Sequence, residues 1–467
     1  MTTLLRSTPE SVGISSEKLC ALLDQLSRLD SLNSIMILRH GKVCLEGWWK
    51  PYAPHQPHML FSLSKSFVSA AIGIAAGEGR LAVTDPLAGF FPEQAECITD
   101  DRMRDVTFHD LLCMASGHAT CAAGTMRSDP DGDYVRGFLA SRLTYTPGEH
   151  FCYNSGATYM LAAVIRKLTG LNVREYLQPR LFDPLGIVPG VWDCCPKGTN
   201  FGGWGLHLKT EDIAKFAKLL LHQGNHNGQQ LIPTDYLAEA TKRQSDNSMN
   251  EAPDWKLGYG YQFWRSAHGF RGDGACGQYA IVVPEKDLAI AITSCIENMQ
   301  NVLTILWNEL IPALEDVPLP ENPAGNERLL ATASNLSMPI MQGTAQRPVP
   351  RQSFAFKPNP AGIHSLSVEA GEDECALTFH TNRGVEQLRA GFGSHRVSTF
   401  QLTDPMAHPT AASAAWVADD VLEIQSFCLD GTYRDTYQIR FNDPEHPLKR
   451  TMRCSLLRPA MAELTVG

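Results

Sequence analysis

The sequence predicts an α+β domain of about 315 residues followed by a smaller all-β domain. Apolar segments typical of strands occur near both ends of the first 315 residues, and a mostly helical stretch lies between them. After a proline-rich stretch, short alternating segments separated by Gly, Asn and Asp continue along the rest of the chain. A sheet built from both ends of the first part, with helices inserted, accounts for this order.

The first predicted elements are a helix and two strands. Leucines at helical spacing predict a helix over residues 15–27. Residues 34–38 and 43–48 read as strands, and His40-Gly41 between them fits a tight turn. An uncharged run rich in small residues, 66–77, then predicts a helix that is buried all round.

The stretch from about residue 85 to residue 224 is predicted to be helical and rich in loops. Helices are expected over 156–168 and 213–222, because each apolar run is followed by a glycine that can end a helix, Gly170 or Gly224.

Strand patterns return after this helical stretch. Residues 258–264 are predicted as one strand, and 279–283 with 288–293 as a hairpin that turns at 284–287. A helix with an apolar stripe over 302–310 completes the first domain.

The rest of the chain is predicted as a linker and a separate domain. Residues 316–350 contain six prolines, a density typical of a linker, and include a short helix near 326–336. Residues 351–467 are predicted as an all-β domain, a small barrel or sandwich.

Composition argues against several classes of function. The chain has 467 residues, a net charge of −10 and no long basic run, so neither nucleic acid nor an anionic membrane is an expected partner. Its longest apolar run, residues 68–77, is too short to span a bilayer. The N-terminus has no apolar signal core, so we expect a cytoplasmic protein. The sequence leaves open whether the chain forms homo-oligomers.

The thirteen cysteines are expected to be reduced thiols, mostly in the core. They show no regular spacing and no Cys-x-x-Cys pair, and the adjacent Cys194 and Cys195 cannot form an easy unstrained bridge. The 15 histidines include no His-Glu-x-x-His motif. We therefore predict neither a metal site nor a cofactor, and a zinc site among the histidines is the alternative.

Ser62 and Lys65 form a Ser-x-x-Lys motif at the start of the predicted buried helix. Residues three apart share a helix face, with Cβ atoms roughly 5–6 Å apart, so Lys65 lies over Ser62. Burial disfavours the charged lysine, and a neutral amine can take the serine proton. Ser15 and Lys18 repeat the spacing, but there a helix N-cap and a solvated lysine explain the residues. At the start of an uncharged helix, a lysine without a function is costly.

Acyl transfer also needs a proton donor for the leaving group. Tyr153, in the segment Tyr153-Asn154-Ser155 just before the helix at 156–168, is the candidate. A neighbouring cationic lysine is expected to lower its pKa, so that it serves as base and then as acid. The alternative is a half-buried loop aromatic.

The third motif is a glycine-rich segment that contains Gly272, Gly274 and Gly277. The spacing matches a dinucleotide-binding fingerprint, which we reject because a strand follows where that fingerprint needs a helix. We interpret the glycines as letting a substrate lie close along a strand edge. Backbone N–H groups there, with that of Ser62, would form an oxyanion hole. A glycine-rich hairpin without a role is the alternative.

Together and in this order, the three motifs resemble the serine β-lactamase and penicillin-binding superfamily. The nearest branch is the class C β-lactamase-like serine hydrolases, which include family VIII carboxylesterases, D-aminopeptidases and 6-aminohexanoate-dimer hydrolases. The resemblance covers about residues 8–315, and within that range the stretches 109–117 and 203–206 also look like the family. It implies a β-lactamase-like antiparallel sheet with flanking helices and an inserted helical region. The all-β domain resembles the accessory domain of such hydrolases.

The resemblance implies a role for each motif. Ser62 is the acylated nucleophile and Lys65 its base, coupled to Tyr153, which then protonates the leaving group. The N–H groups of Ser62 and Ala275 hold the oxyanion, and water hydrolyses the acyl-enzyme.

Two departures from the family pattern bear on the substrate. Ser155 stands where the family usually has Asn, and its shorter side chain reaches less far toward a substrate. The family's third motif usually begins with Lys or His, a cation for a substrate carboxylate. Gly272-Asp273-Gly274 stands in that place here, unless His268-Gly269 is the correct alignment. Asp273 is expected to repel a carboxylate and to favour an amine-bearing substrate, or else to face away.

The sequence thus predicts a serine hydrolase that acts through an acyl-enzyme on a small ester or amide. β-Lactamase and D-amino-acid peptidase activities are expected to be weak. Transfer of the acyl group to another acceptor is one alternative, and a non-catalytic ligand-binding protein on the same scaffold is another.

Overall fold

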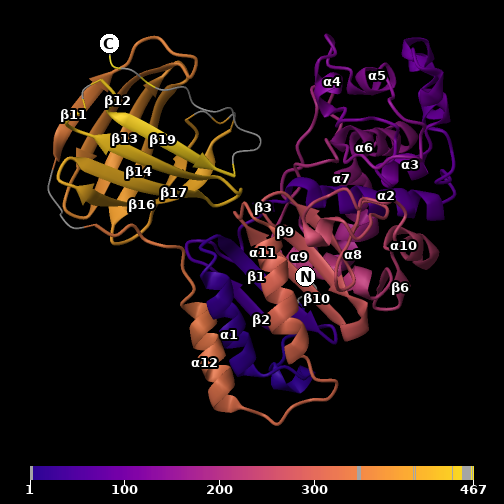
Figure 1. Cartoon of the computed structure of the whole chain (residues 1–467), viewed down its shortest axis with the longest axis horizontal. Coiled ribbons are helices and arrows are strands. Elements are labelled where there is room, and N and C mark those ends of the chain that lie inside the picture. The colour runs from indigo at the N-terminus through magenta and orange to yellow at the C-terminus, as the bar shows by residue number, and fades with distance from the viewer. Residues whose placement is uncertain are drawn as a thin grey trace.

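The computed structural model describes residues 4–343, 349–402, 404, 406–443, 445–454, 464 and 466. An α+β part with an inserted helical region is followed by a β domain (Figure 1). This architecture confirms the fold class that the sequence predicts.

A six-stranded antiparallel sheet forms the centre of the first part. Its strands lie in the order β2 (Lys42–Trp48), β1 (Leu32–Arg39), β10 (Leu288–Ser294), β9 (Gln278–Val283), β8 (Phe270–Gly274) and β7 (Trp264–Arg265). Ile35 of β1 lies opposite Ile292 of β10. The sheet is therefore built from distant parts of the chain, as the sequence predicts, and both predicted hairpins are confirmed.

Helices cover both faces of this sheet, because the central strands carry apolar residues on both sides. On one face, Ile35 and Ile292 share an apolar cluster with α1 (Ser16–Ser27), α11 (Gln300–Ile305) and its continuation η9 (Leu306–Leu310). On the other face, Met36 and Ala291 share a cluster with α2 (Ser64–Gly77) and α9 (Thr210–Leu221). The site described below lies on the α2 face.

The helical region lies between β2 and β7. Its further helices are α3 (Phe108–Leu112), α4 (Ala123–Arg127), α5 (Tyr134–Leu139), α6 (Ser155–Thr169), α7 (Val173–Leu177), α8 (Asp183–Leu185) and α10 (Thr234–Ala240). Two short strand pairs accompany them, β3 (His58–Met59) with β4 (His207–Leu208) and β5 (Asn225–His226) with β6 (Gln229–Gln230). The helices predicted at 156–168 and 213–222 are confirmed as α6 and α9. Among the described residues, no helix has both the length and the apolar composition needed to cross a bilayer.

The strand predicted over residues 258–264 is wrong except at its end, where β7 begins. Gly258 and Gln262 have positive φ angles of 113° and 65°, which interrupt an extended conformation. A Cβ at Gly260 would lie 2.1 Å from the carbonyl oxygen of Ala240, so this position requires a glycine for close backbone contact. The alternation of glycine and aromatic residues imitates a strand, whereas the segment turns against the helical region.

The stretch predicted as a linker is packed over much of its length. α12 (Pro323–Ser334) lies beside α1 (Figure 1). Leu329, Leu336 and Met338 belong to the same apolar cluster as α1 and the sheet. Pro323 occupies a first-turn position, where proline is compatible with a helix. We propose that the domain boundary lies near residue 340 rather than at residue 316.

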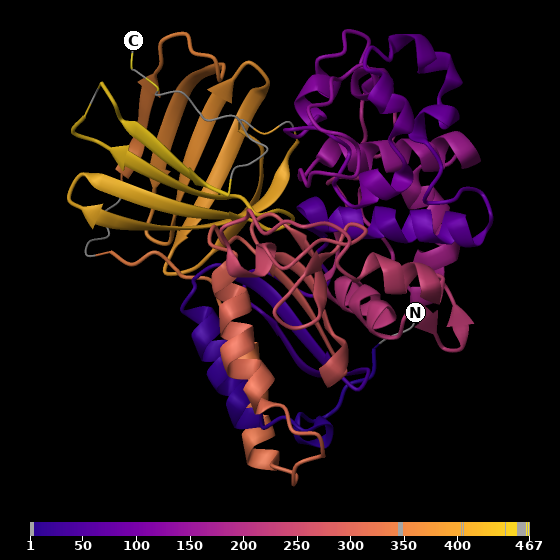
Figure 2. The ribbon, with the colours of Figure 1, turned by 45° about the vertical axis from the view of Figure 1, so that its right-hand side comes forward.

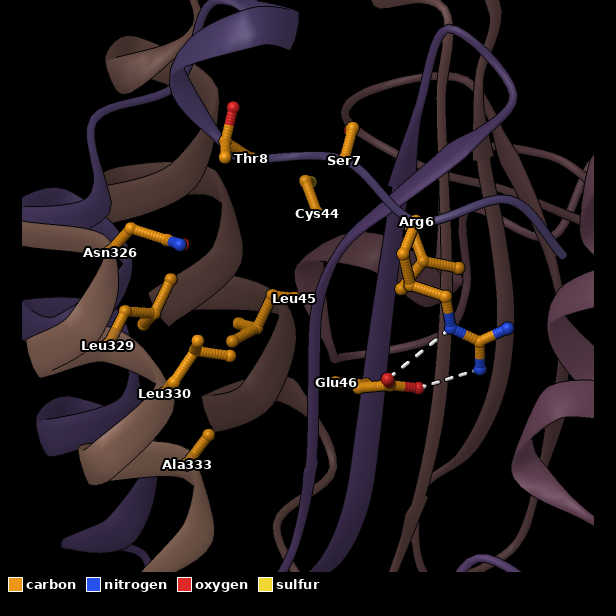
Figure 3. A pocket seen from close by; sticks show the side chains of 11 residues that line it. Arg6, Ser7, Thr8, Cys44, Leu45, Glu46, Asn326, Leu329, Leu330 and Ala333 are labelled. Carbon is orange, nitrogen blue, oxygen red and sulfur yellow. Dashed lines mark hydrogen bonds and ion pairs between the residues drawn. The ribbon is translucent and has the colours of Figure 1, made fainter. Parts of the chain in front are cut away.

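A surface groove lies between α12 and the outer strand β2 (Figure 3). Leu329 and Leu330 line it from the helix and Leu45 from the strand. Arg6 also lines it and forms an ion pair with Glu46 at 2.9 Å. This groove is at the sheet edge opposite to β7 and β8.

The β domain is one nine-stranded sheet that curls around its own apolar cluster (Figure 1). Its strands are β11 (Val349–Ala355), β12 (Ile363–Ala370), β13 (Glu374–Thr381), β14 (Gly384–Phe392), β15 (Arg396–Phe400), β16 (His408–Ala418), β17 (Val421–Cys428), β18 (Arg434–Arg440) and β19 (Leu448–Arg453). Neighbouring strands are antiparallel except β14 and β16, which pair in parallel over two positions. The predicted all-β domain is therefore present.

The β domain contacts the first part close to the segment that carries Ser62 (Figure 2). The Met59 N–H donates to the Asp430 carbonyl oxygen at 2.9 Å. The Tyr52 hydroxyl donates to the Cys428 carbonyl oxygen at 3.1 Å. These bonds tie the turn after β17 to the residues that precede Ser62.

Replacing Leu329 by Ala is expected to lower the free energy of unfolding by about 2–4 kcal/mol, because this side chain is buried and its loss leaves a cavity. Leu330→Ala is the matched control, since this neighbour is 63% exposed and should change stability by less than about 0.5 kcal/mol. Urea denaturation followed by the fluorescence of the tryptophans, including the buried Trp49, measures both. Equal effects would contradict the packed position of α12.

Candidate active site

Ser62 lies where a short strand leads into the buried helix α2. The chain passes from β3 through the turn η2 (Phe61–Leu63) into α2. Phe61 has a positive φ of 46°, a strained conformation for a bulky residue and one that clusters at functional sites. The helical geometry places Lys65 Nζ 3.0 Å from Ser62 Oγ, as the spacing of the motif predicts.

The Lys65 amine is buried among three oxygen atoms. Nζ lies 3.0 Å from Ser155 Oγ and 2.7 Å from the Gly203 carbonyl oxygen, in addition to Ser62 Oγ. Burial lowers the pKa of Lys65 from 10.5 to about 7. The lowered pKa that the motif predicts is confirmed.

These contacts orient the amine. A neutral lysine amine has two N–H groups and one lone pair. The Gly203 carbonyl can only accept a hydrogen bond, and the Ser155 hydroxyl can accept a second one. The lone pair is then left for the Ser62 hydroxyl, which is the arrangement of a base.

Tyr153 lies beside this pair, with its hydroxyl near enough to the Ser62 side chain to interact with it. The Lys65 amine lies 4.9 Å from the centre of the tyrosine ring. The predicted lowering of the tyrosine pKa is wrong: burial raises the pKa of Tyr153, and the charge of Asp273 adds to the rise. Lys65 cannot reverse this, because burial removes much of its own charge near neutral pH. The phenol therefore keeps its proton.

Ser155 contacts Lys65 rather than an open pocket. It is the first residue of α6, whose N-terminus is capped by the Asn154 side chain. Its N–H lies 3.3 Å from Cys121 Sγ. A Cβ at Gly203 would lie 3.1 Å from Ser155 Cβ, so the glycine lets this loop approach closely enough for its carbonyl to reach Lys65.

Gly272 and Gly274 make room for the segment that carries Ser62. A Cβ at Gly272 would lie 2.5 Å from Ser66 Oγ, and one at Gly274 would lie 2.0 Å from the Leu60 carbonyl oxygen. The expectation that these glycines leave space for a substrate is therefore corrected. Their missing side chains allow β8 to lie directly on residues 60–66.

Ala275 follows the end of β8 that contacts this segment. Its backbone N–H has no hydrogen-bond partner within the described ranges of the chain, and the residue is half-buried. The neighbouring Gly274 lies so close that a Cβ there would be 3.1 Å from the Leu63 nitrogen. The strand end thus presents a free N–H next to the start of α2.

Asp273 is buried and paired with Arg271, with 3.0 Å between Oδ2 and Nε. Burial raises the pKa of Asp273, and the charge of Arg271 opposes the rise. Trp264 also interacts with this carboxylate and stacks on Tyr153, with ring centres 5.3 Å apart. Asp273 also acts electrostatically on Lys65 and Tyr153, so its charge is felt in the site, and its predicted effect on a substrate carboxylate stays a prediction.

Two groups of the site are missed by sequence reasoning. The Gly203 carbonyl is a backbone group, so the amino-acid type at this position does not indicate its contact with Lys65. Trp264 ends the segment 258–264, whose strand pattern gives no indication that this side chain contacts Tyr153.

The second Ser-x-x-Lys copy has different surroundings. The Ser15 side chain accepts a hydrogen bond from the Glu17 N–H and caps α1, while Lys18 is exposed. The N-cap interpretation is confirmed.

The model of a protein family described as Beta-lactamase matches residues 33–301, more than half of the chain. The chain belongs to the beta-lactamase family. A 6-aminohexanoate-dimer hydrolase of Paenarthrobacter ureafaciens is 23% identical over 261 residues, which cover 52% of this chain and 67% of that relative. A D-aminopeptidase of Brucella anthropi is 27% identical over 176 residues, which cover 33% of this chain and 31% of that relative. The predicted superfamily is confirmed, and these relatives are hydrolases.

The octameric penicillin-binding protein homologue of Pyrococcus abyssi has a similar fold, with a TM-score of 0.50 and 16% identity. The similarity covers 94% of this chain and 99% of that structure. It therefore includes the β domain as well as the beta-lactamase part.

The labelling rate of Ser62 by a fluorophosphonate is expected to rise with pH and to reach half its maximum near pH 7. Below this pH Lys65 is protonated and cannot accept the serine proton, and above it the amine is neutral. The second-order labelling rate is measured from about pH 5.5 to about pH 9.

Lys65→Arg is the control for this pH profile, since a guanidinium stays protonated. The rate should fall by about 10²-fold or more at every pH. A wild-type rate that is independent of pH would rule out Lys65 as the base.

Proposed function

We propose that this protein is a serine hydrolase that acts through an acyl-enzyme on a small ester or amide. The observation that carries the proposal is the buried Lys65 amine, with its pKa lowered to about 7 and its Nζ 3.0 Å from Ser62 Oγ. A serine hydroxyl needs a base within hydrogen-bond reach to become a nucleophile.

Acylation begins when Lys65 takes the Ser62 proton and Ser62 Oγ attacks the substrate carbonyl carbon. The negative charge on the carbonyl oxygen is held by the N–H groups of Ser62 and Ala275. Tyr153 gives its proton to the departing alcohol or amine, and the neighbouring ammonium of Lys65 then gives its proton to the tyrosinate. The raised pKa of Tyr153 suits this role, because the phenol holds its proton until the leaving group needs it.

Deacylation uses water in place of the leaving group. The water loses a proton to the Lys65 amine, which is neutral again, and attacks the ester carbon. The acid is released as the Lys65 ammonium returns that proton to Ser62 Oγ. Transfer to another alcohol or amine follows the same steps with a different acceptor.

Two features favour a small ester or amide over a β-lactam or a cell-wall peptide. Ser155 is engaged with Lys65, so its hydroxyl is not directed to a substrate side chain. The triplet Gly272-Asp273-Gly274 supplies no cation for a substrate carboxylate, and Arg271 is tied to Asp273. The names of the two relatives, a 6-aminohexanoate-dimer hydrolase and a D-aminopeptidase, agree with amide hydrolysis.

Ser62→Ala is expected to lower kcat/KM for p-nitrophenyl esters by more than about 10³-fold, because the acyl-enzyme can no longer form. Esters of increasing chain length give the preferred acyl group. Ser15→Ala, in the other motif copy, is the matched control and should retain full activity. Esterase activity that survives in Ser62→Ala would contradict the assignment of Ser62 as the nucleophile.

Tyr153→Phe is expected to lower kcat by about 10²–10⁴-fold with a smaller change in KM, since it removes a proton donor and leaves the ring in place. Tyr159→Phe is the control, because this buried hydroxyl contacts Cys195 Sγ at 3.4 Å instead of Ser62. If both variants lose activity equally, the tyrosine hydroxyl acts through stability and not through proton transfer.

Nitrocefin hydrolysis tests the β-lactamase alternative in parallel. Turnover should be slow compared with the best ester, and fast turnover would favour a β-lactamase. A protein that neither labels with fluorophosphonate nor hydrolyses any ester or amide would favour a ligand-binding role.

A further inference from the structure

Three side chains with metal-binding atoms meet where the β domain contacts the Ser62 segment. His408 begins β16, Cys428 ends β17, and Asp430 lies in the turn that follows. His408 Nδ1 lies 2.9 Å from Asp430 Oδ1, and Cys428 Sγ lies 3.1 Å from the same oxygen. One ligand atom of each residue lies within 4.8 Å of the other two.

A fourth donor comes from the first part of the chain. His207 in β4 is buried, and its Nε2 has no hydrogen-bond partner among the residues that the structure describes. The ring lies near Asp430 and His408, but it is not part of the group whose ligand atoms lie within 4.8 Å of one another, so it would have to move toward them to bind the same ion. A buried nitrogen without a partner is costly, which points to a group that the protein residues do not supply.

The backbone holds these two sides together. β4 pairs with β3, so that His207 lies opposite Met59. The Met59 N–H in turn donates to the carbonyl oxygen of Asp430. His207 and the β17 turn are thus fixed on either side of the same short strand, three residues before Ser62.

We propose that His207, His408, Cys428 and Asp430 bind one divalent transition-metal ion of the zinc type, which joins the β domain to the first part of the chain. Two imidazoles, a thiolate and a carboxylate form a donor set that zinc accepts in tetrahedral geometry. Zinc–ligand bonds of about 2.0–2.3 Å place neighbouring ligand atoms roughly 3.3–3.7 Å apart. The His408–Asp430 and Cys428–Asp430 separations of 2.9 and 3.1 Å therefore need to open by a few tenths of an ångström, whereas His207 has to approach from outside this group.

Metal binding exchanges bonds that are already present. The hydrogen bonds from His408 and Cys428 to Asp430 are replaced by bonds to the ion, and the Cys428 thiol proton leaves to solvent. His207 Nε2 gains the partner that the protein lacks there. The proposal goes beyond the chemistry of Ser62 and does not depend on it.

A second thiol cluster lies at the same domain contact and serves as the internal control. Cys276, Cys295 and Cys454 form an apolar cluster of their own, with Cys454 supplied by the β domain. The Cys454 thiol interacts with those of Cys276 and Cys295, and none of the three belongs to the group of His408, Cys428 and Asp430.

Titration of the chelator-treated full-length chain with Co²⁺ tests the proposal. We expect one cobalt per chain, with the intense visible bands of tetrahedral cobalt and a thiolate-to-cobalt charge-transfer band. Cys428→Ser should abolish the charge-transfer band, and His207→Ala and His408→Ala should weaken binding by at least about tenfold. Cys454→Ser and Cys375→Ser, which remove thiols outside the proposed site, should leave the spectrum unchanged.

Several outcomes would overturn the proposal. The first is that the wild-type chain takes up no stoichiometric amount of cobalt. The second is a charge-transfer band that survives in Cys428→Ser but vanishes in Cys454→Ser. The third is an unchanged cobalt affinity in His207→Ala, because the ion would then not join the two domains. Competition by Zn²⁺ and a higher melting temperature of the wild-type chain with Zn²⁺ are expected, and the latter should be lost in Cys428→Ser. Circular dichroism of each variant separates loss of the site from loss of the fold.

Discussion

The desolvation of one amine is the constraint on which the site depends. Lys65 lies where its charge is costly, and the burial is tolerated because oxygen atoms satisfy its hydrogen bonds. Each oxygen comes from a different part of the chain: Ser62 precedes α2, Ser155 begins α6, and Gly203 lies in the loop before β4. The three segments must be in place together, since the displacement of any one leaves a buried polar group unsatisfied.

The features that the sequence reveals are those set by local spacing. The contact between Ser62 and Lys65 needs one helical turn, and the β9–β10 hairpin needs one tight turn, so a few residues are sufficient to predict each. The direction of the Tyr153 pKa shift is different in kind. It depends on Asp273 and on the burial that the assembled fold imposes, neither of which is encoded near the tyrosine.

The glycines of β8 show why a correct location can come with a wrong reason. Gly272 and Gly274 are needed for close approach, as their pattern indicates, but the partner is the Ser62 segment. A sequence reports that space is required and not what fills it. The same limit applies to the predicted linker. Its prolines are visible in the sequence, but the packing of α12 through Leu329 can be recognised only when α1 is known to lie beside it.

The pairing of β1 with β10 has a consequence for the order in which the protein is made. Ile35 and Ile292 are neighbours in the sheet although more than half of the chain separates them. During synthesis, β1 and β2 leave the ribosome long before their central partner exists, and contacts between such distant residues form slowly. α2 has no sheet to cover it in that interval, so Lys65 stays hydrated and keeps an ordinary basicity. The burial that lowers the pKa of Lys65 is therefore complete only when the last strand of the sheet is in place.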